Sequence, residues 1–81
     1  MLRHQDISDD ALRKQIKNRL VLFGGNMPHK IYGRLNCTAG KRMSKKNRVF
    51  FESETEAIEL GFRPCGHCLR TAYKNWKDGL V

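Results

Sequence analysis

Three cysteines constrain this chain more than any other feature of its sequence. Cys65 and Cys68 are separated by two residues in Cys65-Gly66-His67-Cys68, and Cys37 lies well upstream of them. A chain of 81 residues buries only about 60% of its unfolded surface, so such domains commonly depend on disulfides or a metal. An odd number of cysteines cannot form a complete disulfide framework. The sequence therefore favours a domain held together by a metal ion.

The Cys65–Cys68 pair has the spacing of a zinc knuckle at the start of a helix. Such a turn aims both sulfurs at one point, about 2.3 Å from the ion, and the helix start adds positive potential. A redox dithiol is the alternative, but it belongs in a thioredoxin-like βαβ setting that this sequence lacks. We expect Cys37, just after a strand, to be the third ligand, with a buried structural thiol as the alternative.

The fourth ligand of this predicted zinc site is left open by the sequence. A closed structural site has four ligands. The candidates are the histidines His4, His29 and His67, a water molecule, or a ligand from outside the chain. His67 lies inside the knuckle, where intervening side chains usually point away from the metal. An open fourth position would imply chemistry at the metal.

Caps, turns and apolar spacing predict a single small α+β domain over residues 1–81, stapled by zinc, with a short β-sheet and about three helices. The expected elements are a helix capped by Ser8, strands over Lys30–Leu35 and Val49–Phe51, a helix over Ser53–Leu60 ended by Gly61, and a helix after Cys68. Ser53 and Glu56 form a predicted capping box. The run Leu20–Phe23 either finishes the first helix or forms a strand, and Gly24-Gly25-Asn26 ends it.

Apolar periodicity also predicts which helix faces are buried. The first helix has a stripe at Leu12, Ile16 and Leu20. The last helix has a face with members at positions i, i+3, i+4 and i+7, namely Leu69, Ala72, Tyr73 and Trp76. We expect the aromatic residues Phe50, Phe51, Tyr73 and Trp76 to pack in the core rather than to stack on nucleic-acid bases.

The charge of the chain points to a polyanionic partner. The formal net charge is +8, and the stretch from residue 11 to 51 holds no acid but eleven Lys and Arg residues. One-sign stretches of this kind favour nucleic acid, with a basic surface that binds nothing as the alternative. The residues expected to contact DNA phosphates are Lys41, Arg42, Lys45, Lys46, Arg48 and Arg63. The alternative role for Arg63 is to pack its aliphatic stem along the core and brace the loop.

The sequence also predicts where the protein functions. The first residues carry charges where a signal peptide needs an apolar core, and no apolar run approaches the roughly 18 residues of a membrane span. We therefore expect a cytoplasmic, monomeric protein with reduced cysteines and no membrane association.

Two segments resemble a known family. The run Asn47–Ile58, followed by Gly61-Phe62-Arg63-Pro64-Cys65-Gly66-His67-Cys68, resembles the N-terminal zinc domain of the Ada DNA-repair proteins, as does Tyr32–Cys37. The resemblance covers residues 30–69, and residues 1–29 read as an N-terminal helix and loop. It implies a four-thiolate zinc site on a domain that contacts DNA. It also implies a zinc-bound cysteine that accepts a methyl group from a methylphosphotriester.

The chain departs from this pattern at one decisive position. The acceptor cysteine of the family falls on Gly33, which supplies neither a nucleophile nor a ligand. We therefore expect a zinc-binding, DNA-binding module without the methyl-acceptor reaction. The alternatives are a single-turnover methyl acceptor that uses one of the remaining thiols, and a zinc-stabilised protein-interaction module.

Overall fold

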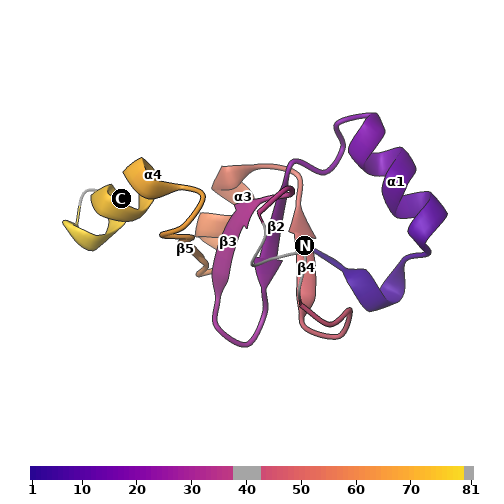
Figure 1. Cartoon of the computed structure of the whole chain (residues 1–81), viewed down its shortest axis with the longest axis horizontal. Coiled ribbons are helices and arrows are strands. Elements are labelled where there is room, and N and C mark those ends of the chain that lie inside the picture. Colours follow the sequence, from indigo (N-terminus) through magenta and orange to yellow (C-terminus); the bar gives the residue numbers. More distant parts are fainter. Residues whose placement is uncertain (38–42, 80–81) are drawn as a thin grey trace.

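The computed structural model describes residues 1–37 and 43–79 and confirms a small α+β fold. The elements are β1 (Leu2–Arg3), the short 3-10 helix η1 (His4–Asp6), α1 (Asp9–Lys17), β2 (Phe23–Asn26), β3 (Ile31–Arg34), β4 (Arg48–Phe51), α3 (Glu54–Glu59), β5 (Arg63–Pro64) and α4 (Arg70–Lys77). The molecule measures 39 × 23 × 20 Å, with the sheet between α1 at one end and α4 at the other (Figure 1).

The five strands form one sheet in the order β1-β4-β2-β3-β5. All neighbours are antiparallel except β3 and β5, which run parallel. In the register of the central strands, Gly24 pairs with both Phe50 and Gly33. Because paired residues share a face and neighbours along a strand alternate, Gly24 and Gly33 lie together on one face of the sheet.

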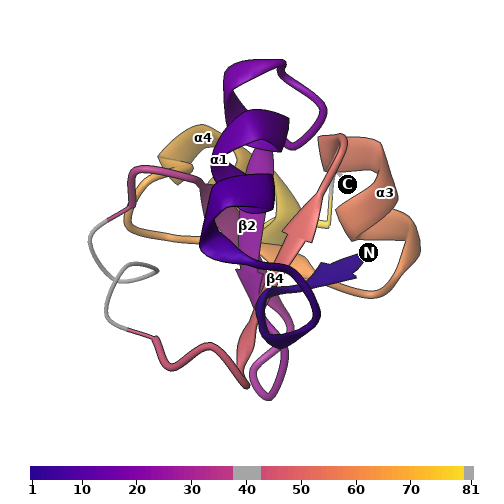
Figure 2. The same ribbon diagram turned by 90° about the vertical axis from the view of Figure 1, so that its right-hand side faces the viewer.

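Each face of the sheet carries its own hydrophobic cluster. One cluster contains Tyr32, Val49, Phe51, Ala57 and Phe62, so α3 covers that face through Ala57. The other contains Leu12, Val21 and Phe50, so α1 covers the opposite face through Leu12. Viewed along the long axis, α1 crosses in front of β2 and β4 (Figure 2). Phe50 and Phe51 are therefore core residues, as predicted.

Strand β2 is the main departure from the predicted fold. The sequence suggested that Gly24-Gly25-Asn26 ends an apolar run, but these residues form most of a central strand. A Cβ atom on Gly25 would lie 2.8 Å from Cε2 of Phe51 and 3.0 Å from the carbonyl oxygen of Ile31. Contacts this short are not tolerated, so this part of the strand needs a residue without a side chain. The two-residue strands β1 and β5 were not predicted either.

Local signals located the helix boundaries well. Ser8 Oγ accepts the Ala11 N–H at 3.2 Å, and Ser53 Oγ accepts the Glu56 N–H at 3.1 Å, so both predicted N-caps are confirmed. Gly61 follows α3 with a φ of +89°, the left-handed conformation that glycine adopts most easily. The predicted strand over residues 30–35 loses one residue at each end to give β3, and the strand over residues 49–51 gains one at its start to give β4.

The predicted buried faces of the first and last helices are wrong in part. Helix α1 ends at Lys17, which leaves Leu20 outside the helix with 57% of its surface exposed. Helix α4 buries none of its residues, and Trp76 is 40% exposed. Of the four residues on the predicted face, all of which the structure describes, only Leu69, just before α4, packs against a core cluster. Within the described residues, no helix has the length and apolar character that a membrane crossing requires.

Candidate metal centre

The three cysteines come from two neighbouring regions of the sheet edge. Cys37 is buried in the turn after β3, where its N–H donates to the Arg34 carbonyl at 3.1 Å. Cys65 follows β5, and its N–H donates to the Tyr32 carbonyl at 2.8 Å, which holds the knuckle against β3. The turn continues through Cys68 into α4. Backbone pairing between β3 and the knuckle therefore brings residues about 30 positions apart to one place.

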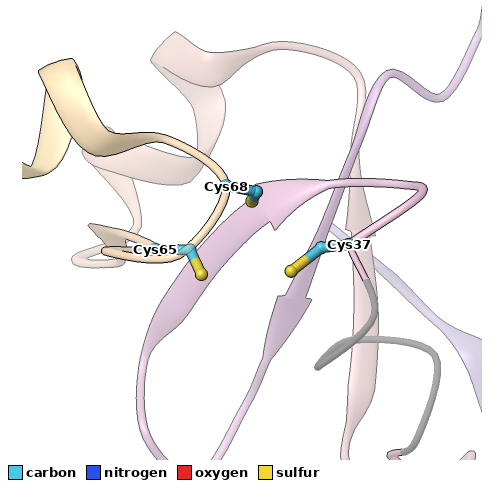
Figure 3. Close-up of side chains that lie close together, drawn as sticks. All are labelled: Cys37, Cys65 and Cys68. Carbon is cyan, nitrogen blue, oxygen red and sulfur yellow. The ribbon is translucent and has the colours of Figure 1, made fainter.

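The sulfurs of Cys37, Cys65 and Cys68 form a compact group, called here the thiol cluster. All three atoms lie within 4.8 Å of one another. Figure 3 shows the three side chains converging on a common space beside β3. Two sulfurs bound tetrahedrally to one zinc ion lie about 3.8 Å apart, given a Zn–S bond of about 2.3 Å. Small side-chain rotations are therefore enough for the cluster to hold zinc.

Two backbone N–H groups point at the sulfurs. The Arg34 N–H lies 3.3 Å from Cys68 Sγ, and the His67 N–H lies 3.4 Å from Cys65 Sγ. Such bonds stabilise thiolate charge when a metal is bound. Without metal, burial raises the pKa of the Cys68 thiol to about 11, with the neighbouring thiols adding to the effect and the Arg34 N–H opposing it. Zinc must therefore displace a proton from Cys68 on binding.

The predicted histidine ligands are not brought to the cluster. In the described part of the chain, no histidine, aspartate or glutamate joins the three sulfurs, and residues 38–42 and 80–81 contain none of these types. His4 packs edge-on against Phe50, at 5.3 Å between ring centroids, and pairs with Asp9. His29 is exposed in the turn between β2 and β3, and His67 is exposed in the knuckle. The described side chains thus offer three ligands.

Gly33 lies directly against the thiol cluster. A Cβ atom built on Gly33 would lie 2.8 Å from Cys68 Sγ and 3.1 Å from Cys65 Cβ. The residue at the acceptor position implied by the resemblance is therefore next to the sulfurs, and it contributes no sulfur of its own.

The match to a family model agrees with this geometry. The model described as the metal binding domain of Ada matches residues 12–70. The chain belongs to this family. Searches among curated proteins and solved structures gave no match. The matched region begins well before residue 30, so it also takes in most of α1 and all of β2, which the sequence resemblance did not cover.

Family and geometry together identify this Ada-type domain as a zinc-binding domain. Cys37, Cys65 and Cys68 are the residues that would hold the ion, and bound zinc would supply a cross-link and stabilise thiolates. That cross-link ties the turn after β3 to the start of α4. Since α4 buries no residue of its own, its position depends on this connection and on the contacts of Arg63.

Most of the predicted phosphate-contacting residues that the structure describes already have contacts within the protein. Lys45 Nζ pairs with Asp9 at 3.0 Å. The Arg48 guanidinium lies over the Phe50 ring and donates to the Leu35 carbonyl at 3.4 Å, while burial lowers its pKa. Lys46 is exposed. Lys41 and Arg42 lie outside the described residues.

Arg63 holds α4 against the sheet. Its guanidinium lies 5.5 Å from the Tyr73 ring centroid and 5.4 Å from that of Trp76, and it donates to the Pro64 carbonyl. The aromatic face of α4 therefore surrounds a cation instead of entering the hydrophobic core. These contacts are made by the guanidinium rather than by the aliphatic stem that the alternative for Arg63 invoked.

The structure adds two cations that the sequence reasoning missed. Arg34 and Arg70 line an open groove of about 700 Å³ beside Cys68, together with His67, Thr71 and Asn75. We call these five residues the basic groove. Both arginines lie close in sequence to the metal centre, Arg34 next to Gly33 and Arg70 two residues after Cys68. Their closeness in sequence to the metal-binding cysteines is the signal that could have identified Arg34 and Arg70 as candidate site residues.

Proposed function

We propose that this zinc-binding domain binds the sugar-phosphate backbone of DNA through the surface around its metal centre. The observation that carries the proposal is the basic groove, which places Arg34 and Arg70 beside Cys68. No acidic residue is among the described residues that line it. A concave, acid-free surface with two arginines suits phosphate, because guanidinium groups match phosphate oxygens in pairs.

The start of α4 adds to the positive potential of the groove. Its N-cap residue is Leu69, which makes no side-chain capping hydrogen bond. The first N–H groups of the helix belong to Arg70 and Thr71, which line the groove, and the N-cap side chain accepts from neither of them. Helix starts attract anions for this reason, and here the arginines supply full charges at the same place.

Lys45 and Lys46, in the loop before β4, are proposed as a second phosphate contact separate from the groove, since Lys45 pairs with Asp9 at the start of α1. Lys45 and its partner Asp9 each keep 58% of their side-chain surface exposed. An ion pair this exposed contributes little, so a phosphate can replace Asp9 at small cost. Lys41 and Arg42 stay in the proposal on the sequence alone. Binding of this kind is driven by counterion release and carries no base specificity.

We propose further that the domain binds DNA without accepting a methyl group. The support is Gly33, which the family resemblance aligns with the acceptor position and which carries no sulfur. If a remaining thiol reacted instead, intact-mass measurement after incubation with methylphosphotriester DNA would show a gain of about 14 mass units, one CH₂, on a cysteine. We expect no gain, and a stoichiometric gain would overturn this part of the proposal.

The DNA-binding proposal is tested by the salt dependence of affinity for duplex DNA. We expect affinity to fall as salt rises, with a slope of log affinity against log salt that reflects the number of phosphate contacts. Arg34→Gln with Arg70→Gln should weaken binding and reduce that slope by about two, one for each lost contact. The Arg34 backbone N–H to Cys68 Sγ is kept in this variant.

The matched control is Lys14→Gln with Lys17→Gln, which removes the same charge from exposed positions on α1. Helix α1 lies at the end of the molecule opposite α4 (Figure 1). Equal losses in both double variants would mean that net charge alone governs binding. No binding at low salt would overturn the proposal and leave the protein-interaction alternative.

The same domain is proposed to act in the cytoplasm as a monomer. Its three cysteines form no disulfide in the described part of the chain, and a reducing compartment keeps cysteines in this state. Light scattering of the zinc-loaded protein tests the oligomeric state, and a mass of twice the 9.4 kDa chain would contradict it.

A further inference from the structure

A small pocket lies beside the thiol cluster on the same face of the sheet. It has a volume of about 120 Å³ and is lined by Cys37 and Cys65, with Gly24 and Gly33 among its other residues. Gly24 and Gly33 are register partners on β2 and β3, so two facing positions without side chains lie next to each other. We call this site the glycine pocket. Space remains over Gly24, where a Cβ atom would meet its nearest neighbours only at 3.8–3.9 Å.

The size and lining of the glycine pocket define what it can hold. A cavity of about 150 Å³ lined by apolar side chains is known to bind benzene, so about 120 Å³ suits a molecule of a few heavy atoms. Ile31 and Met43 contribute apolar side chains, and Arg48 contributes a cation. A ligand with a short apolar body and a negatively charged donor atom fits this lining.

We propose that the glycine pocket binds a small thiol from outside the chain, whose sulfur becomes the fourth ligand of the zinc held by Cys37, Cys65 and Cys68. The thiol would supply the sulfur that Gly33 lacks. On binding, its S–H bond breaks, the proton passes to solvent and the thiolate sulfur bonds to the metal, with no change of oxidation state. The proposal requires zinc binding but not DNA binding.

The packing around Gly33 determines the side from which the external sulfur approaches. The space where a Cβ atom of residue 33 would lie is taken by Cys68 Sγ, at 2.8 Å. Cys37 and Cys65 line the pocket, whereas Cys68 is not among its described lining residues. The ligand therefore reaches the cluster between Cys37 and Cys65, with its carbon atoms over Gly24.

The test uses the protein loaded with Co²⁺ and prepared with a phosphine reductant, so that no small-molecule thiol is present at the start. Titration with 2-mercaptoethanol should give a saturable rise in sulfur-to-cobalt charge-transfer absorption, because the number of thiolate ligands increases. Ultrafiltration must show that cobalt stays with the protein. No spectral change at millimolar thiol, or removal of the metal by the thiol, would overturn the proposal.

Gly24 provides the variants that decide whether the pocket matters. A Cβ atom there would meet its nearest neighbours at 3.8–3.9 Å, which is ordinary contact, so Gly24→Ala is tolerated and Gly24→Val fills more of the pocket. We expect thiol affinity to fall slightly with alanine and about tenfold or more with valine. Zinc affinity, measured by chelator competition, should be unchanged. Equal thiol affinity in the wild type and both variants would show that the thiol binds elsewhere.

Discussion

At two neighbouring glycines of β2, the structure predicts opposite effects of the same substitution on stability. Gly24→Ala and Gly25→Ala each add one methyl group to the central strand, one position apart. At Gly25 the new Cβ atom would meet Phe51 Cε2 at 2.8 Å and Val49 Cγ2 at 3.2 Å. At Gly24 the nearest atom is the Val49 carbonyl oxygen, at 3.8 Å. Because the chemical change is identical, any difference in stability reports these contacts.

The expected magnitudes follow from the two environments. Overpacking a well-packed core costs typically 1–3 kcal/mol, and Gly25→Ala has no easy relief because one of the atoms it meets is the backbone oxygen of Ile31. At Gly24 an alanine fits. Because alanine gives the unfolded chain less conformational entropy than glycine does, the substitution should stabilise the folded protein by about 0.4–1 kcal/mol. For a domain of this size, a loss of ~2 kcal/mol lowers Tm by about 8–16 °C.

Thermal and urea unfolding of the zinc-loaded variants, followed by circular dichroism, measures both effects. Zinc content must be verified for each, because loss of metal would lower stability by another route. The reasoning is refuted if Gly25→Ala is as stable as the wild type, or if Gly24→Ala loses as much as Gly25→Ala. Either result would mean that the close contacts at Phe51 and Ile31 do not require the glycine.

Three further predictions concern the metal, a histidine and a buried tyrosine. Chelation of zinc should shift the fluorescence of Trp76, the single tryptophan, to longer wavelength. The reason is that α4 buries no residue and, without the metal, is released from Arg63. An unchanged spectrum would show that α4 stays docked without metal. Burial, together with the charges of Arg48 and Lys45, lowers the pKa of His4 in the folded state below 6.5. The unfolded chain therefore binds the proton more readily, and the free energy of unfolding should fall as pH drops below about 7. The His4→Gln variant should show a flatter pH dependence of stability in urea titrations. Tyr32→Phe removes the 2.8 Å hydrogen bond to Glu54 and should cost about 0.5–1.5 kcal/mol in the same assay, with no change in zinc content.

Features that depend on a few consecutive residues could be predicted from the sequence. Ser8, Ser53 and Gly61 mark helix ends because capping is a local hydrogen-bonding event. The knuckle at Cys65 and Cys68 is local in the same sense, and adding Cys37 needed only the expectation of a strand before it. The family resemblance rested on these same local runs.

Features that depend on distant neighbours could not be predicted. Gly25 reads as a strand breaker by its own preference, and only the Phe51 ring and the Ile31 carbonyl make glycine necessary there. The aromatic face of α4 has the spacing of a buried helix, yet the Arg63 guanidinium occupies its contact surface. In both cases the deciding atom comes from another element of the fold.

The choice among the three histidines likewise depended on the tertiary structure. Residue type made His4, His29 and His67 all candidates, although the position of His67 inside the knuckle counted against it. The fold then places His4 on Phe50 and leaves the other two exposed, so the described chain offers the metal three sulfurs. Distance in space, which the sequence does not contain, eliminated all three histidines.

The absence of a fourth thiolate also bears on the proposed partner. A zinc ion with four thiolates carries two net negative charges, whereas one with three carries a single negative charge. A phosphate approaching the basic groove beside Cys68 meets less repulsion in the second case, and Arg34 and Arg70 more than offset the remaining charge. An anionic thiol in the glycine pocket would restore the second negative charge. If both proposals hold, DNA affinity should therefore fall when the pocket is filled by thiol, and this coupling should disappear in Gly24→Val.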